Sequence, residues 1–176
     1  GGYHSVVLKK SIYQDIYHIV GWGNSSCGQA DSPTGADYIS IKAWNSFSVA
    51  LKENGSIIAW GCTDYGKTNP PTGNNYIEID SGRDYGLALK DDGSIVGWGL
   101  NNYNQATPPA GNDYMAIAAG ASHAIALKSD GSIDNWGFAS SSHAAPPGHY
   151  VAVDDGDSHN IALKSDGSLT VWGPGI

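Results

Sequence analysis

A twelve-residue motif recurs along the chain and restricts the fold more than any other sequence feature. Ala-Leu-Lys-x-Asp-Gly-Ser-Ile-x-x-Trp-Gly occupies 88–99, returns with few changes at 50–61, 126–137 and 162–173, and has a degenerate copy between Val7 and Gly23. Self-similarity at a period near 40 residues, in units of β type, is typical of propeller blades or a β-solenoid. The motif's tryptophans lie 38, 38, 38 and 36 residues apart, at Trp22, Trp60, Trp98, Trp136 and Trp172.

Each unit is predicted to contain three strands. The first strand is expected at 37–43, 75–81, 113–119 and 149–155, where apolar residues alternate with a period of two, as in Ile77 and Ile79. The second and third strands are the two halves of the motif, for example 123–128 and 132–137. They are joined by Asp-Gly or Asn-Gly, the strongest short hairpin signal, for which we expect type I′ turns with φ > 0 at both central residues.

Polar connections containing proline separate the units, as at 68–73 and 106–111. Proline cannot donate to a strand ladder, so these segments are predicted to be loops. The first unit differs, because it lacks a first strand and carries a longer hairpin within Lys10–His18. We therefore expect one all-β domain over 1–176, with units of approximately 1–36, 37–74, 75–112, 113–148 and 149–176.

Charge and hydropathy exclude two classes of partner. The formal net charge is −8 and Arg83 is the only arginine, so a basic surface for nucleic acid is absent. No apolar run approaches the ~20 residues of a membrane span, so membrane insertion is not expected. No catalytic motif, phosphate loop or carboxylate pair stands out, and the chain is predicted to be non-catalytic, without cofactor or metal.

The full unit Gly-x-x-His-x-x-Ala-Leu-Lys-x-Asp-Gly-Ser-Ile-x-x-Trp-Gly is carried by 120–137, with variants at 82–99 and 156–173. The copy at 82–99 is followed by Asn101–Gln105 and Pro108-Pro109. This unit and the connection after it resemble the repeat of the regulator of chromosome condensation 1 superfamily. The compact repeats are most similar to the bacterial secreted members, typified by beta-lactamase inhibitor protein II. The resemblance implies a β-propeller of ~38-residue blades whose loops bind another protein.

Propellers of this family close with about seven blades, whereas this chain has about 4.5 to 5 repeats. It is therefore five-bladed, part of a larger propeller, or completed by a second chain. The unpaired first hairpin favours the last two alternatives, because a blade without its first strand leaves an exposed edge.

Topology separates the loops into two groups. The corners between first and second strands and the exits of the third strands should lie at one end of the blades, here called the top face, and the Asp-Gly turns at the other. The top-face loops vary and are aromatic, and variable loops on a rigid scaffold are where binding residues concentrate. The predicted contact residues are Tyr3, Trp44, Phe47, Tyr65, Arg83, Asp84, Tyr85, Asn101 and Tyr103.

Trp44 stands where other units have glycine, and either caps the core or forms an exposed anchor. The repeated tryptophans are expected to pack between blades.

His4, His123 and His159 occupy equivalent positions. Three imidazoles suit zinc, but we expect each histidine to hydrogen-bond the corner of its own unit. Cys27 and Cys62 follow Trp-Gly pairs on adjacent units, and a disulfide is not expected because blade ends usually diverge beyond the ~7 Å that it tolerates.

The function predicted on this basis is a non-catalytic protein-binding propeller, extracellular or at the cell surface. Its partner is another protein, with a β-lactamase-like enzyme as one specific candidate, or further copies of the chain. Two alternatives stay open. One is a structural repeat segment of a larger extracellular assembly, and the other is a carbohydrate-binding propeller.

Overall fold

The computed structural model describes residues 4–11, 16–138 and 144–174, and these ranges form five antiparallel sheets. Each sheet corresponds to one repeat unit and is called a blade. Blade 1 has β1 (His4–Lys10) and β2 (Tyr17–Gly23); blade 2 has β3 (Tyr38–Trp44), β4 (Phe47–Lys52) and β5 (Ile57–Gly61); blade 3 has β6 (Tyr76–Ser81), β7 (Tyr85–Lys90) and β8 (Ile95–Gly99); blade 4 has β9 (Tyr114–Ala119), β10 (His123–Lys128) and β11 (Ile133–Gly137); blade 5 has β12 (Tyr150–Asp155), β13 (Asn160–Lys164) and β14 (Leu169–Trp172). A short 3₁₀ turn, η1 (Asp64–Gly66), follows blade 2.

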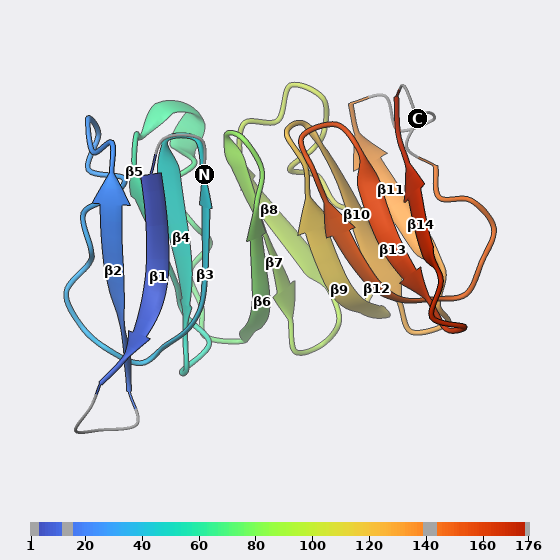
Figure 1. Ribbon diagram of the computed structural model, residues 1–176, viewed down its shortest axis with the longest axis horizontal. Helices are drawn as coiled ribbons and strands as arrows, with labels where there is room; N and C mark the ends of the chain where they lie inside the picture. Colours follow the sequence, from blue (N-terminus) through green and yellow to red (C-terminus); the bar gives the residue numbers. More distant parts are fainter. Residues whose placement is uncertain (1–3, 12–15, 139–143, 175–176) are drawn as a thin grey trace.

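The blades stand side by side in chain order, with blade 1 at one end of an open row and blade 5 at the other (Figure 1). The first strands of successive blades are neighbours, because β3 contacts β6, β6 contacts β9, and β9 contacts β12. These four strands therefore form the inner wall of the arc. The predicted three-stranded unit is confirmed for blades 2 to 5, and blade 1 is a two-stranded hairpin, as predicted.

The predicted hairpins form, but the predicted turn type is wrong. In blade 3, the Gly93 amide donates to the Lys90 carbonyl at 3.0 Å, and the Lys90 amide donates to the Ser94 carbonyl at 2.9 Å. Gly93 has φ of 80°, whereas Asp92 does not have a positive φ. This is a type I turn followed by a left-handed glycine in a three-residue loop. The Asp92 carboxylate holds it by accepting from both the amide and the hydroxyl of Ser94, at 2.9 and 2.6 Å.

The core lies between blades rather than within them. Leu87, Leu89 and Ile95 of blade 3 pack against Tyr114, Ile117 and Trp136 of blade 4. Equivalent clusters join blades 1 and 2, 2 and 3, and 4 and 5. The prediction that the repeated tryptophans pack between blades is thus confirmed for Trp60, Trp98, Trp136 and Trp172. In the described residues it does not hold for Trp22, which is 54% exposed.

A register shift in each inner strand changes the expected alternation. The pairing slips between Tyr76 and Glu78 in blade 3, and at the same place in blades 2, 4 and 5. Ile77, at the slip, is exposed, whereas Ile79 is fully buried. Only the second apolar residue of each predicted pair therefore belongs to the core. The exposed counterparts of Ile77 are Ile39, Met115 and Val151.

A disulfide joins Cys27 to Cys62, contrary to expectation, with the Cα atoms 4.9 Å apart. The connection after blade 1 does not diverge from blade 2 but passes across its top: a Cβ placed on Gly61 would lie 3.0 Å from the Cβ of Gln29. The bond therefore ties the two-stranded blade 1 to blade 2. Among the described residues, no helix is long and apolar enough to cross a membrane.

Candidate partner-binding surface

The corners between first and second strands and the exits of the third strands lie at the same end of blades 2, 3 and 4, as predicted for the top face. In blades 2, 3 and 4, the first residue after the third strand donates its amide to a corner carbonyl: Cys62 to Ser46 at 2.9 Å, Leu100 to Asp84 at 2.8 Å, and Phe138 to Ser122 at 2.8 Å. These bonds fix the loops to the blade ends. The top face is therefore a set of braced loops on a rigid scaffold.

Corner loops of three different blades meet in one cleft on this face. Trp44 and Asn45 of blade 2, Arg83 of blade 3 and Asp157 of blade 5 line a cavity of about 350 Å³. The Arg83 guanidinium (Nη2) lies 3.3 Å from the Asp157 carboxylate (Oδ1), and both side chains are mostly exposed. Trp44 is half-buried. The structure thus brings together two predicted residues, Trp44 and Arg83, with two that were not predicted, Asn45 and Asp157.

Exposed aromatic side chains stand at three successive exits. The Tyr103 and Phe138 rings, from the exits of blades 3 and 4, meet edge to face with centroids 4.8 Å apart. Tyr65 stands alone at the exit of blade 2 with a left-handed backbone, φ 60°, and is 64% exposed. Tyr65 and Tyr103 are therefore where the prediction placed them, and Phe138 joins Tyr103 as an unpredicted partner.

Two predicted contact residues lie in the core. Phe47 and Tyr85 each begin the second strand of a blade, and both are 0% exposed. Tyr85 donates its hydroxyl to the His123 carbonyl of the next blade, and burial raises its pKa well above the usual value. The expectation that these aromatics lie on the surface is corrected, because this strand position faces the following blade rather than the solvent.

Asp84 and Asn101 hold loops in place. The Asp84 carboxylate accepts from the ammonium group of buried Lys67 at 2.6 Å, and Lys67 also donates to Ser46 at 3.0 Å. The Asn101 amide oxygen accepts from the Ala106 amide, and its nitrogen donates to the Thr107 hydroxyl, both at 2.9 Å. Their polar groups are thus engaged within the chain. Tyr3, the remaining predicted contact, lies outside the described residues.

We expected each of the three equivalent histidines to hydrogen-bond its own corner, and in the structure two of them contact the next blade. His4 Nε2 lies 2.8 Å from the Ser48 hydroxyl of blade 2, and His123 Nε2 lies 2.9 Å from the Asp155 carboxylate of blade 5. Both therefore point to the next blade, like Tyr85. His159, in blade 5, is exposed. The described residues contain no group of three metal-ligating side chains.

Acidic side chains gather between the inner strands. Asp80 accepts from the Ala119 amide at 2.9 Å and lies 3.2 Å from the Lys42 ammonium. Glu78 lies on the same side of β6, and desolvation, with a smaller effect of the Asp80 charge, raises its pKa to about 7. Burial also raises the pKa of Asp80. These groups link blades 2, 3 and 4 beneath the top face.

Comparison with known proteins connects this architecture to one repeat family. Residues 76–105, which contain blade 3 and its exit loop, match the family model described as the regulator of chromosome condensation (RCC1) repeat. The chain has an RCC1-like propeller fold. No curated protein matches the sequence significantly.

Solved structures with this fold superpose on most of the RCC1-like chain. Human WBSCR16 gives a TM-score of 0.78 at 19% identity, covering 97% of this chain and 59% of its own. The ectodomain of the Physcomitrella patens receptor kinase CR4 gives 0.76 at 21%, covering 90% and 47%. Prp20p of Saccharomyces cerevisiae, described with its binding to Gsp1p and histones, gives 0.74 at 18%, covering 89% and 54%. The chain thus spans about half the length of these structures.

Proposed function

We propose that this RCC1-like chain is a non-catalytic protein-binding propeller whose partner contacts the top face. The convergence of three corner loops on one cleft carries the proposal. Trp44, Arg83 and Asp157 come from blades 2, 3 and 5, so only the assembled arc places them together. Tryptophan and arginine are the residues most enriched among interface hot spots.

The chemistry of the cleft favours a protein partner. It offers an indole face for an apolar side chain, a guanidinium for a carboxylate and a carboxylate for a basic group. The Tyr103–Phe138 pair adds a second apolar contact on exits of neighbouring blades. A surface that combines rigid aromatic anchors with exposed charges of both signs matches the apolar centre and polar rim of protein interfaces. That Prp20p binds Gsp1p, and that yeast RCC1 was solved bound to Kap60, supports a protein partner for this fold.

We further propose that the chain acts outside the cell or at its surface, like the bacterial secreted proteins that its short repeats resemble. The Cys27–Cys62 bond supports this location. Disulfides persist in oxidising compartments and are rare where glutathione and thioredoxin keep thiols reduced.

Affinity capture with matched variants tests the top face. Immobilised wild-type protein and the variants Trp44→Ala and Tyr103→Ala are exposed to the same extracellular protein mixture, and captured proteins are quantified by mass spectrometry. Removal of one hot spot costs ≥ 2 kcal/mol, or about 30-fold in affinity. We therefore expect the specific partner to be depleted on both variants.

Tyr17→Ala is the matched control, because Tyr17 is an exposed aromatic on β2, at the other end of blade 1 from the top face. It should capture the partner as the wild type does. Equal capture by the wild type and both top-face variants would refute the assignment of this face. Loss on Trp44→Ala alone would restrict the contact to the cleft.

A further inference from the structure

One position of the corner loops changes its chemistry from blade to blade. In blades 3, 4 and 5 the corner begins with a glycine whose amide donates to the carbonyl of the residue three positions later: Gly82 to Tyr85 at 3.0 Å, Gly120 to His123 at 2.9 Å, and Gly156 to His159 at 2.8 Å. The residue after this glycine, or after Trp44 in blade 2, is here called the variable corner position, and in blades 2 to 5 it is Asn45, Arg83, Ala121 and Asp157. Its side chain therefore changes from an amide to a guanidinium, a methyl group and a carboxylate, while the bond that closes the corner is repeated.

The fold brings the variable corner positions of three blades to the same place. Asn45, Arg83 and Asp157 line the top-face cleft together with Trp44. Ala121 lies between Arg83 and Asp157 in chain order, and its amide donates to the Asp157 carbonyl at 3.3 Å. Arg83 thus reaches past blade 4, whose own variable side chain is a methyl group, to the carboxylate of blade 5.

The Arg83–Asp157 ion pair leaves most of the bonding capacity of both groups unused. Among the described residues it is a single contact between nitrogen and oxygen of 3.3 Å, and the side chains are 52% and 68% exposed. A guanidinium can donate two parallel bonds to one carboxylate, and only its Nη2 is engaged here. Exposed ion pairs contribute little to stability, and the corners are already closed by backbone bonds. The pair therefore presents a cation and an anion in a fixed order without being needed to hold the loops.

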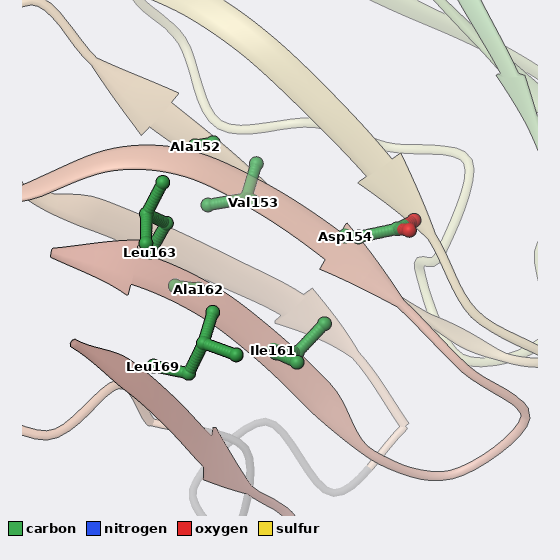
Figure 2. A pocket seen from close by; sticks show the side chains of 7 residues that line it. All are labelled: Ala152, Val153, Asp154, Ile161, Ala162, Leu163 and Leu169. Atoms are coloured by element: carbon green, nitrogen blue, oxygen red, sulfur yellow. The ribbon is translucent and has the colours of Figure 1, made fainter. Parts of the chain in front are cut away.

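The cavity of about 240 Å³ on blade 5 lacks this arrangement. Its seven lining residues all come from β12, β13 and β14, and Asp154 is the only charged one among them (Figure 2). Its apolar side chains, such as Ile161, stand at positions whose counterparts in blade 4, such as Ile125, pack against blade 5. These positions are used for packing between blades, whereas the top-face cleft combines side chains of three blades.

We propose that the variable corner position selects the partner by the order of its charges, an inference that rests on the proposed function because it concerns the same cleft. The partner segment carries an apolar, an acidic and a basic side chain in that order. The apolar group lies on Trp44, the carboxylate on Arg83, and the basic group on Asp157, following blades 2, 3 and 5. Complementary charges of this kind supply specificity and fix the register of an interface more than they raise its affinity.

An exchange of the two charges tests this assignment. The double variant Arg83→Asp/Asp157→Arg keeps the net charge and allows the same ion pair, but it reverses the charge order. Two synthetic peptides of equal composition serve as probes: Ac-Leu-Glu-Gly-Lys-NH₂ has the proposed order, and Ac-Leu-Lys-Gly-Glu-NH₂ has the reverse. Binding is measured by nuclear magnetic resonance titration of the protein's backbone amides with up to about 10 mM peptide.

The expected preference follows from the strength of exposed ion pairs. One such pair changes an affinity by roughly 1.5- to 5-fold, and the two peptides differ in two pairs. The wild type should bind the peptide with the acidic residue first at least about threefold more tightly, and the exchange variant should show the opposite preference. Arg83→Asp alone and Asp157→Arg alone should show no preference. Tyr17→Ala should behave as the wild type does, and circular dichroism checks that all variants are folded.

Three results would overturn the charge order: no binding of the first peptide to the wild type, equal affinity of the wild type for both peptides, or an unchanged preference in the exchange variant. The last result would mean that the ion pair only supports the loops. If capture of the partner is lost on Trp44→Ala while the exchange variant shows no inversion, the charge order fails and the partner-binding role of the cleft stands. Unchanged capture on both Trp44→Ala and Tyr103→Ala would overturn the proposed function itself.

Discussion

The Cys27–Cys62 bond should supply a large part of the stability of the N-terminal end of the protein. Blade 1 has two strands, and its Val7 and Trp22 side chains are exposed where the equivalent residues of blades 3 to 5 are buried, so it contributes less buried apolar surface than they do. The disulfide fastens its exit loop to the exit of blade 2. We therefore expect the double variant Cys27→Ala/Cys62→Ala to lose stability, and blade 1 to be affected most.

The loss can be calculated from the length of the closed loop. The cysteines are separated by 35 residues, and a loop of that size removes about 13 cal/mol/K of entropy from the unfolded chain, or about 4 kcal/mol at 25 °C. For a chain of this length, each kcal/mol lowers Tm by roughly 2–4 °C. The double variant should therefore melt roughly 10 °C below the wild type.

Urea unfolding of the oxidised wild type and the double variant, followed by circular dichroism, measures the free-energy difference. Hydrogen exchange locates it: amides of β1 and β2 should exchange much faster in the variant, and those of β9 to β11 should change little. Wild-type protein treated with a thiol reductant should behave as the variant does. A loss below about 1 kcal/mol, or equal acceleration of exchange in all blades, would refute the reasoning.

Three further substitutions test the internal contacts. Leu89→Ala should destabilise the protein by about 2–5 kcal/mol, as measured by urea unfolding, because Leu89 is fully buried between blades 3 and 4; a loss below about 1 kcal/mol would contradict this packing. Lys67→Met leaves the largely buried Asp84 carboxylate without its cation and should cost about 3 kcal/mol, while a loss below about 1 kcal/mol would show that the pair is dispensable. The pKa of Glu78, raised from 4.5 to about 7, means that the folded state retains a proton that the unfolded state releases. Stability should therefore fall as pH rises from about 4.5 to about 7, and Glu78→Gln should flatten that fall by about 1 kcal/mol; an unchanged pH profile would contradict the shift.

Most of the fold was predictable from the spacing of the repeats. The tryptophan period and the Asp-Gly pairs located the hairpins of blades 2 to 5, because turn and packing positions recur at the same place in every unit. The turn type was not predictable from the Asp-Gly pair alone. That pair suits a two-residue type I′ loop as well as a three-residue loop in which only the glycine is left-handed. The second form occurs here, and the Asp92 contacts with Ser94 stabilise it.

The residues of the candidate site were only partly predictable from the sequence, because some meet from distant parts of the chain and others lie at strand positions whose direction the sequence does not state. Trp44 stood out because it replaces a glycine of the repeat. Asp157 did not, because its contact with Arg83 joins residues 74 positions apart in non-adjacent blades. Phe47 and Tyr85 were misplaced because aromatic character was taken as a sign of exposure. The sequence held a signal against exposure. His4 and His123 occupy the same strand position as Phe47 and Tyr85, and in the structure His4, His123 and Tyr85 contact the next blade.

The division of surfaces within one repeat has a consequence for binding. The side chains that face neighbouring blades are used for packing, whereas the top-face loops are braced by backbone bonds and leave Trp44 and Tyr103 at least partly exposed. Substitutions on the two kinds of surface should therefore separate partner binding from stability. Tyr103→Ala removes one exposed aromatic pair and should lower the free energy of unfolding by about 1 kcal/mol or less, while it depletes the captured partner. Urea unfolding and affinity capture of the same samples measure both effects. A loss of stability as large as that of Leu89→Ala would mean that Tyr103 supports the fold rather than the partner contact.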